Sequence, residues 1–228
     1  MERIRLLNLS ITPQYLFKKT LLIGDAIKFH ESIFALPFAY IGMILAADGL
    51  PSLHQFLWIT IAMVAARTVG MSANRIIDRD IDAKNPRASA RHLPAGLLNV
   101  TEMVGLIIVS LSIFILAAAQ LNTLALILAP VAAAYLIIYP FTKRFTWAAN
   151  LLLGWALAIA PSAAWIAVQG SLSFEPVLLS LAVAFWAGSF DILYHTQDLS
   201  FHLREQLHSV AARFRCTRHA SSPQRLVD

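Results

Sequence analysis

The sequence has few charged residues and almost no cysteine. Of its 228 residues, 14% are charged and 58% are hydrophobic, which is more apolar than an ordinary soluble domain. The single cysteine, Cys216, has no second cysteine with which to form a disulfide within the chain. No group of cysteines and histidines has the spacing of a zinc site. These absences argue against a disulfide framework and against a structural metal centre.

Long apolar runs take the place of these features. Ten-residue alternations typical of membrane strands are missing, so each run is interpreted as a helix. Each run has about the length needed to cross a hydrocarbon layer of about 30 Å. The sequence therefore predicts an all-α, polytopic transmembrane helix bundle of about six spans. The predicted spans are 32–50, 53–73, 102–120, 122–140, 146–168 and 174–194.

The basic residues lie in alternate connections between the predicted spans. Of the eighteen Lys and Arg residues, five precede the first span, five lie in 75–91, two are Lys143 and Arg144, and five follow the sixth span. The connections near Asp48, Gln120 and Glu175 contain none. The positive-inside rule then predicts a multi-pass protein of the inner (cytoplasmic) membrane, with a cytoplasmic N-terminus and a site facing the cytoplasm. Charges placed beside spans favour membrane lipid and a diphosphate as partners, and no nucleic acid.

A first group of polar residues follows the second predicted span. Asn74, Asp78 and Asp82 are spaced i, i+4, i+8 and share one helical face, whereas Asp80 points elsewhere. We call these three residues the first acid stripe. Carboxylate and amide oxygens suit Mg²⁺ together with substrate phosphates. The alternative is that they are solvated acids of a loop, paired with the neighbouring cations Arg75, Arg79 and Lys84.

A second group lies at the cytoplasmic end of the sixth predicted span. Asp191, Tyr194 and Asp198 are spaced i, i+3, i+7 on one predicted helical face, and His202 extends that face by a further i+4 step. We call the first three the second acid stripe. An acid at the hydrocarbon boundary is expensive unless it is paired or functional. The two stripes end at the same depth, but spacing alone does not establish that they meet.

Arg67 is a cation about two turns inside the second predicted span, where a charge is expensive. One interpretation is that its guanidinium holds an aromatic carboxylate or a phosphate, for which its planar fork is suited. The other is a structural ion pair with Asp191 or Glu31.

These segments resemble the UbiA superfamily of intramembrane aromatic prenyltransferases, in its 4-hydroxybenzoate polyprenyltransferase-like branch. The resemblance covers most of residues 25–214. Its motifs are KFHESIFALPFAYIGMILA at 28–46, NRIIDRDID at 74–82, NPRASARHLPAG at 85–96, YPFTKRFT at 139–146 and DILYHTQDLSF at 191–201.

The resemblance implies an enzyme that uses Mg²⁺ to transfer a polyprenyl group from polyprenyl diphosphate to an aromatic acid, in ubiquinone or menaquinone biosynthesis. It implies that Asn74, Asp78 and Asp82 form one diphosphate–Mg²⁺ motif and that Asp191 and Asp198 belong to the other, with Asn74, Asp78, Asp82 and Asp198 as metal ligands. Tyr194 would contact a phosphate or line the pocket. The residues expected to grip the diphosphate are Lys143 and Arg144 and, more weakly, Arg75, Arg87, Arg91 and Arg204.

The sequence also departs from this family. His202 stands where an acid is usual, and Gln206 stands where a glycine is common. The family has about nine spans of the length that a bilayer requires, against about six here. We therefore expect an incomplete transmembrane domain over 1–214 and a polar tail over 215–228 without family resemblance. Two alternatives stay open: an inactive, truncated member of the family, and a membrane transporter that uses Arg67 and Asp191.

Overall fold

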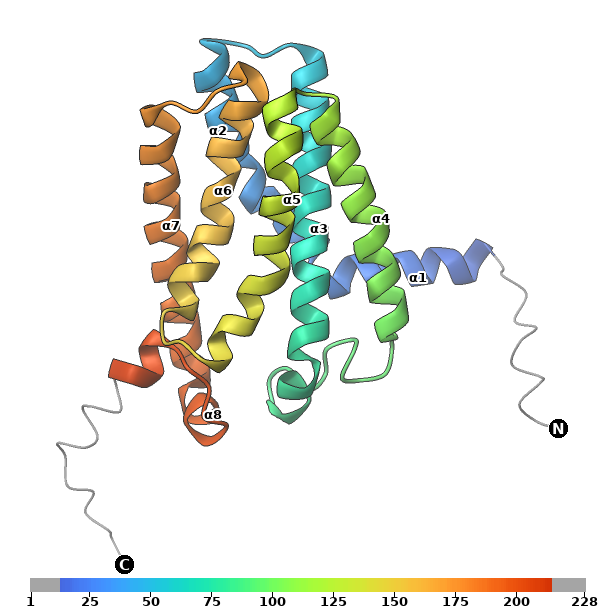
Figure 1. Cartoon of the computed structure of the whole chain (residues 1–228). Helices are drawn as coiled ribbons and strands as arrows, with labels where there is room; N and C mark the ends of the chain where they lie inside the picture. The colour runs from blue at the N-terminus through green and yellow to red at the C-terminus, as the bar shows by residue number, and fades with distance from the viewer. Residues whose placement is uncertain (1–12, 215–228) are drawn as a thin grey trace, which may run out of the picture.

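The computed structural model describes residues 13–214, and this part of the chain contains no strand. Long helices stand side by side in a bundle, and α1 lies across them near one end (Figure 1). The α-helices are α1 (Pro13–Ala26), α2 (Ser32–Ala47), α3 (Leu53–Lys84), α4 (Val100–Ala119), α5 (Thr123–Ile138), α6 (Ala149–Gln169), α7 (Phe174–His195) and α8 (Leu199–Arg204). Three 3₁₀ turns join them, namely η2 (Phe29–Glu31), η3 (Tyr139–Arg144) and η4 (Thr196–Asp198). The predicted all-α architecture is confirmed.

Five of the described helical stretches are long and apolar enough to cross a membrane, one of them being α5 together with η3 (Thr123–Arg144), and α2, with 16 residues, is shorter. Each of the six predicted apolar stretches overlaps one of these helices over most of its length. The main difference is α3, which continues to Lys84 rather than ending near residue 73. Its charged last turns stay helical, and Asp78 and Asp82 on them are buried against other segments of the chain.

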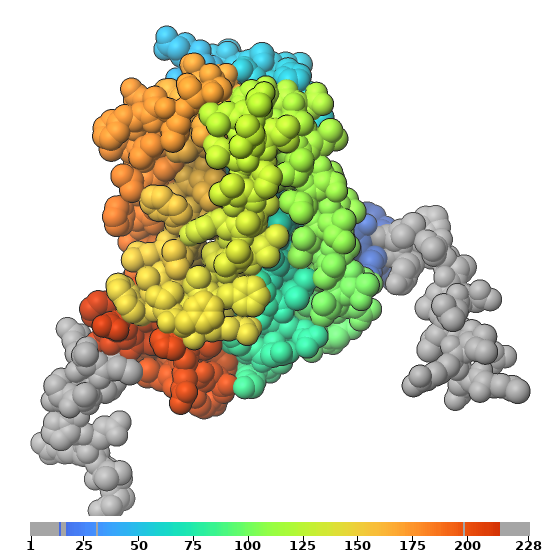
Figure 2. Space-filling model, in the orientation of Figure 1, coloured from blue at the N-terminus to red at the C-terminus, as the bar shows by residue number. Residues whose placement is uncertain are grey.

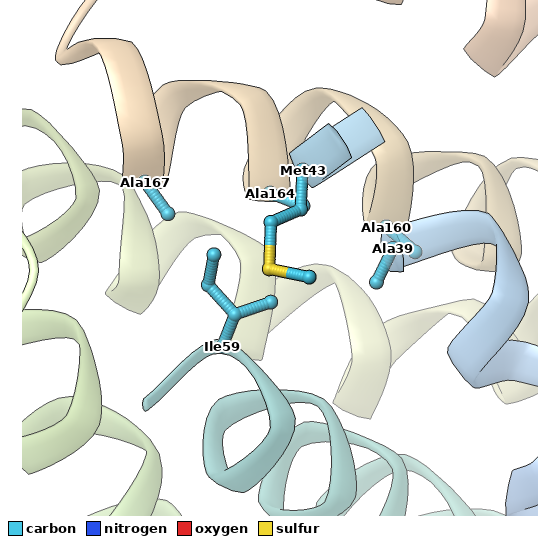
Figure 3. Close-up of a cluster of buried hydrophobic side chains, with 6 residues drawn as sticks. All are labelled: Ala39, Met43, Ile59, Ala160, Ala164 and Ala167. Atoms are coloured by element: carbon cyan, nitrogen blue, oxygen red, sulfur yellow. The ribbon is translucent and has the colours of Figure 1, made fainter. Parts of the chain in front are cut away.

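The interior of the bundle is built from small residues, and many large apolar side chains point outward. Met43 is fully buried and lies between Ile59 of α3 and a row of alanines on α6, Ala160, Ala164 and Ala167 (Figure 3). In contrast, Phe185, Phe190 and Leu193 of α7 are exposed. This distribution suits lipid as the solvent, because helices in a membrane associate through close packing of small residues.

Glycines set the closest helix contacts. A Cβ at Gly42 of α2 would clash with the backbone of Pro161 in α6, and one at Gly154 of α6 would clash with the carbonyl oxygen of Ala184 in α7. Only a residue without a side chain permits such an approach. The three helices α2, α6 and α7 therefore pack backbone to backbone.

The two ends of the bundle differ in charge. The connections 48–52, 120–122 and 170–173 lie at one end and contain neither Lys nor Arg. The 85–99 connection, η3 and α8 lie at the other end (Figure 1), together with most of the described basic residues. There the segment after α7 lies against the end of α3 (Figure 2), where Lys84 bonds Glu205 at 2.9 Å. We call this the basic end.

The tight α6–α7 contact can be tested by adding one methyl group. Gly154→Ala should lower the thermal unfolding midpoint of the detergent-solubilised protein, because overpacking costs about 1–3 kcal/mol. Gly105→Ala is the matched control, since a Cβ at Gly105 in α4 meets nothing within 4 Å. Alanine also favours helix there, so the control midpoint should stay the same or rise. Equal midpoints for both variants would contradict the close contact.

Candidate active site

Two carboxylates of α3 are buried at the basic end of the bundle. Asp78 is 4% exposed and Asp82 is 6% exposed. Asp80, between them, is exposed and pairs with Arg79 at 3.0 Å. The helical periodicity therefore separated the inward acids from the outward one correctly. Burial also argues against the alternative of solvated loop acids for Asp78 and Asp82.

Both buried carboxylates take their cations from other segments. Lys143 of η3 forms an ion pair with Asp78. Arg91 of the 85–99 connection donates from Nη1 to both oxygens of Asp82, at 2.8 and 2.7 Å. Asp78 Oδ1 is buried and has no hydrogen-bond partner among the described residues. One carboxylate oxygen thus remains available to a ligand inside the site.

The α7 side of the site is built around Asp191. Its Oδ2 accepts a hydrogen bond from Asn150 Nδ2 of α6 at 2.8 Å and lies 3.2 Å from His195 Nδ1. The contacts of the Asp191 carboxylate thus come from an amide and an imidazole, whereas Asp78 and Asp82 are paired with Lys143 and Arg91.

The second acid stripe does not lie on one continuous α-helix. α7 ends at His195, and Asp198 belongs to the 3₁₀ turn η4, while His202 belongs to α8. A 3₁₀ turn has about three residues per turn, so it breaks the α-helical periodicity on which the prediction rested. The side chain of Asp198 lies outside what the structure describes, and its metal-ligand role stays a prediction.

Tyr139 of η3 connects the two acid stripes. Its hydroxyl hydrogen-bonds the Asn74 side chain and interacts electrostatically with Asp78 of α3, Asp191 of α7 and Arg67. The ring of His195 likewise interacts with Lys143. Residues far apart in sequence therefore converge around η3, which spacing alone did not establish.

An apolar cavity of about 410 Å³ opens between the helices next to this polar cluster. Arg67 and Tyr139 are among its few polar lining residues. The surface is hollowed where α5 lies beside α6 (Figure 2). The side chain of Glu31, one predicted partner of Arg67, lies outside the described residues. Apolar residues that line the cavity include Met63, Phe114, Leu128, Leu136, Trp155 and Ile159.

The other predicted cations have varied surroundings. Arg75 Nε donates to the Ala26 carbonyl at 2.8 Å, and Arg144 Nη2 donates to the Ile77 carbonyl at 2.6 Å. The Arg204 guanidinium lies over the ring of Phe201. The first two contacts attach neighbouring segments to one another, and the third lies within α8. A role for these three residues in holding the diphosphate stays a prediction.

Arg87 of the 85–99 connection contacts Tyr194 at the end of α7, at the rim of the site. The Arg87 guanidinium lies 4.6 Å from the centroid of the Tyr194 ring and donates to Gln197 at 2.8 Å. A cation over an aromatic face is attracted by the ring's quadrupole. This contact joins the 85–99 connection to the end of α7, and both residues stay candidates for phosphate binding.

The two departures from the family pattern each have a structural counterpart. His202 is buried, with its ring centroid 5.0 Å from that of His195. Gln206 has φ of 54°, a left-handed conformation that glycine adopts without strain. The preference for glycine at that position thus has a physical reason.

Sequence reasoning missed Tyr139, Asn150 and His195 as site residues. Asn150 offered one signal, because it is an amide at the start of an otherwise apolar run. Polar groups in membrane segments usually face a partner inside the bundle. For Tyr139 and His195, only the fold showed which side chains they meet.

The residues present fit a magnesium ion shared with a diphosphate. No three Asp, Glu, His or Cys side chains converge as a complete metal site among the described residues. Mg²⁺, however, is usually bound through one or two carboxylates, with substrate phosphates and waters completing its shell. The unpartnered Asp78 Oδ1 on α3 and the Asp191 carboxylate on α7 supply oxygens of that kind.

The Asp78–Lys143 pair yields a test by charge removal. Lys143→Met leaves the buried Asp78 carboxylate without its cation, so the free energy of unfolding should fall by about 3 kcal/mol. The measurement is SDS titration in mixed micelles. The double variant Asp78→Asn with Lys143→Met removes both charges and should recover most of the loss. If the double variant is no more stable than Lys143→Met, the pair does not have this role.

Comparisons with known proteins identify the family of the chain. The model of the UbiA prenyltransferase family matches residues 35–222. A 4-hydroxybenzoate octaprenyltransferase of Actinobacillus pleuropneumoniae serotype 5b is 35% identical over 192 residues, which cover 84% of this chain and 63% of that protein. The enzyme of the same name from Francisella tularensis subsp. novicida is 32% identical over 172 residues, covering 75% and 61%. The chain thus spans less than two thirds of the length of these relatives.

Solved structures share the fold. A UbiA homolog from Aeropyrum pernix K1 in its apo form superposes with a TM-score of 0.75 at 33% identity, covering 81% of this chain and 70% of that one. A UbiA homolog from Archaeoglobus fulgidus bound to DMAPP and Mg²⁺ has a TM-score of 0.67 at 20% identity, covering 86% and 70%, which shows likeness of fold alone. With the family model matching most of the sequence, the chain belongs to the UbiA prenyltransferase family.

Proposed function

We propose that this chain catalyses Mg²⁺-dependent transfer of a polyprenyl group from polyprenyl diphosphate to an aromatic acid of the 4-hydroxybenzoate type. The observation that carries the proposal is the convergence of Asp78 and Asp191 around Tyr139, next to an apolar cavity. The name shared by the curated relatives supports the acceptor and the reaction. The DMAPP and Mg²⁺ in a homolog of the same fold support the donor and the metal.

Charge complementarity at the basic end would hold the diphosphate. Asn74, Asp78, Asp82, Asp191 and Asp198 are the proposed ligands of metal and metal-bound phosphate. When bound, Mg²⁺ would supply positive charge that stabilises the departing diphosphate. The cations proposed to contact the phosphate oxygens directly are Lys143 and Arg91, which already face the acids, with Arg87 at the rim.

The apolar cavity would serve the other half of the reaction. As the allylic C–O bond breaks, its electron pair leaves with the diphosphate and the prenyl carbon becomes electron-poor. A ring carbon of the aromatic acid then forms the new C–C bond, and loss of that carbon's proton restores the aromatic ring. The apolar walls around Trp155 and Leu136 would exclude the water that competes for the prenyl carbon.

Arg67 is proposed to bind the carboxylate of the aromatic acid. It lines the cavity and lies close enough to the Tyr139 hydroxyl to interact with it electrostatically. A guanidinium can bind a carboxylate through two parallel hydrogen bonds. The acceptor ring would then sit between Arg67 and the diphosphate site.

The distribution of basic residues supports a location for this chemistry. We propose that the basic end faces the cytoplasm, that the N-terminus lies on the same side, and that the chain resides in the inner membrane. We also propose that the prenylated product enters quinone biosynthesis, in the ubiquinone or menaquinone pathway, in line with the names of its relatives.

Substitution of Asp78 tests the proposed reaction. Asp78→Asn should lower Mg²⁺-dependent formation of prenylated 4-hydroxybenzoate by about 100-fold or more, because charge stabilisation of the leaving group is lost. Asp80→Asn is the matched control two residues away. Its carboxylate is exposed, so activity should change by less than about twofold.

A stricter variant removes one acid from each half of the site. If the combined Asp78→Ala and Asp198→Ala variant still forms prenylated 4-hydroxybenzoate, the proposed mechanism is wrong. Flux of anionic solutes through liposomes, without any prenylated product, would favour a transporter.

Substitution of Arg67 separates the two binding partners proposed for its guanidinium. Arg67→Lys keeps the charge but loses the bidentate geometry. We expect the KM for the aromatic acid to rise by about tenfold, with the KM for polyprenyl diphosphate unchanged. Steady-state kinetics with each substrate varied in turn provide the measurement. A rise confined to the KM for the diphosphate would assign Arg67 to the phosphate instead.

A further inference from the structure

Asn150 is a buried amide that joins three parts of the chain. It lies in the first turn of α6 and is 2% exposed. Its Nδ2 donates to Asp191 Oδ2 of α7 at 2.8 Å, and its Oδ1 accepts the backbone N–H of Val210 at 3.0 Å. One side chain therefore holds α6, α7 and the segment after α8 together at the basic end.

The orientation of this amide is determined by its two partners. The Val210 N–H can only donate, so the oxygen of Asn150 must face it. The amino group then faces the Asp191 carboxylate, which can only accept when ionised. The reversed amide would place donor against donor and acceptor against acceptor. Asn150 is thus committed to donating to Asp191.

His195 lies beside the same oxygen. Its Nδ1 donates to the Asp191 backbone carbonyl at 2.8 Å, because a carbonyl oxygen can only accept, and it lies 3.2 Å from Asp191 Oδ2 and 3.1 Å from Asn150 Nδ2. The other carboxylate oxygen, Oδ1, accepts no hydrogen bond from the described residues. The carboxylate is therefore held by one oxygen and presents the other.

We propose that Asn150 is a positioning residue that sets the Asp191 carboxylate for a divalent cation shared with the diphosphate. This inference rests on the proposed function, because it assumes that Asp191 serves that cation. Groups that hydrogen-bond a metal-binding side chain fix its orientation, and their loss typically costs about 10- to 100-fold in metal affinity. Asn150 is such a group, because it donates a hydrogen bond to the Asp191 carboxylate.

The chain offers a matched control in Asn122, a partly buried amide with a similar set of bonds. Its Nδ2 donates to the carbonyls of Ile166 and Ala167 at 2.8 and 3.0 Å, and its Oδ1 accepts from Ala125 N at 2.9 Å. It joins the start of α5 to the end of α6 at the end of the bundle opposite α8 (Figure 1). Its removal should weaken the fold without reaching Asp191.

The experiment measures Mn²⁺ binding by electron paramagnetic resonance on the purified full chain. Mn²⁺ serves as the probe for Mg²⁺, and a prenyl diphosphate analogue whose allylic bond cannot ionise completes the site. Asn150→Ala should raise the dissociation constant for Mn²⁺ by about 10- to 100-fold. Asn122→Ala should bind Mn²⁺ as the unsubstituted chain does, although its thermal unfolding midpoint falls.

A second variant at the same position keeps the inference testable if the Asn150→Ala variant does not fold. Asn150→Asp retains an oxygen for the Val210 N–H but places an anion against Asp191, and it should also weaken Mn²⁺ binding. Unchanged Mn²⁺ affinity in a folded Asn150 variant would overturn the inference. So would equal weakening in the Asn150→Ala and Asn122→Ala variants, since Asn150 would then only support the fold. If the unsubstituted chain fails to bind Mn²⁺ with the analogue, the proposed function fails instead.

Discussion

A carboxylate buried at the end of an apolar bundle needs a cation or hydrogen-bond donors, because its isolated charge is too costly away from water. At this site the partners come from elsewhere in the chain. Lys143 of η3 reaches Asp78, and Arg91 of the 85–99 connection reaches Asp82. Compensation of buried charge therefore attaches two connections to α3. The same compensation places cations where an anionic diphosphate would bind.

Small residues make the other half of the site possible. Gly154 lets α6 approach the backbone of α7 closely, and Asn150 lies one turn earlier on α6. The short distance between the helices brings the Asn150 amide within hydrogen-bonding reach of Asp191. Packing in the apolar middle of the bundle thus positions polar groups at its end. A cavity remains between α3, α5 and α6, with Arg67 and Tyr139 among its few polar lining residues.

Part of the fold and of the candidate site could be predicted from the order of the residues, and part could not. The spacing of Asp78, Asp80 and Asp82 indicated which acids face inward, because an α-helix repeats every 3.6 residues. The same reasoning does not extend to Asp198, because α7 gives way to a 3₁₀ turn after His195. The 3.6-residue spacing predicts a shared face only as long as the α-helix continues. Hydropathy ended the apolar span near residue 73, but it does not register charges that are buried in pairs, and the same helix α3 continues to Lys84.

The sequence by itself determined the apolar helices, their charged and uncharged ends, and the inward face of the first acid stripe, because these depend on local periodicity and composition. Only the tertiary structure decided that Asp78 and Asp191 both lie near enough to Tyr139 to interact with it, and that Asn150 holds Asp191. Those contacts depend on the order and approach of helices around the bundle. Neighbouring helices in lipid are selected by the fit of small side chains across the whole interface, and no short motif records that fit.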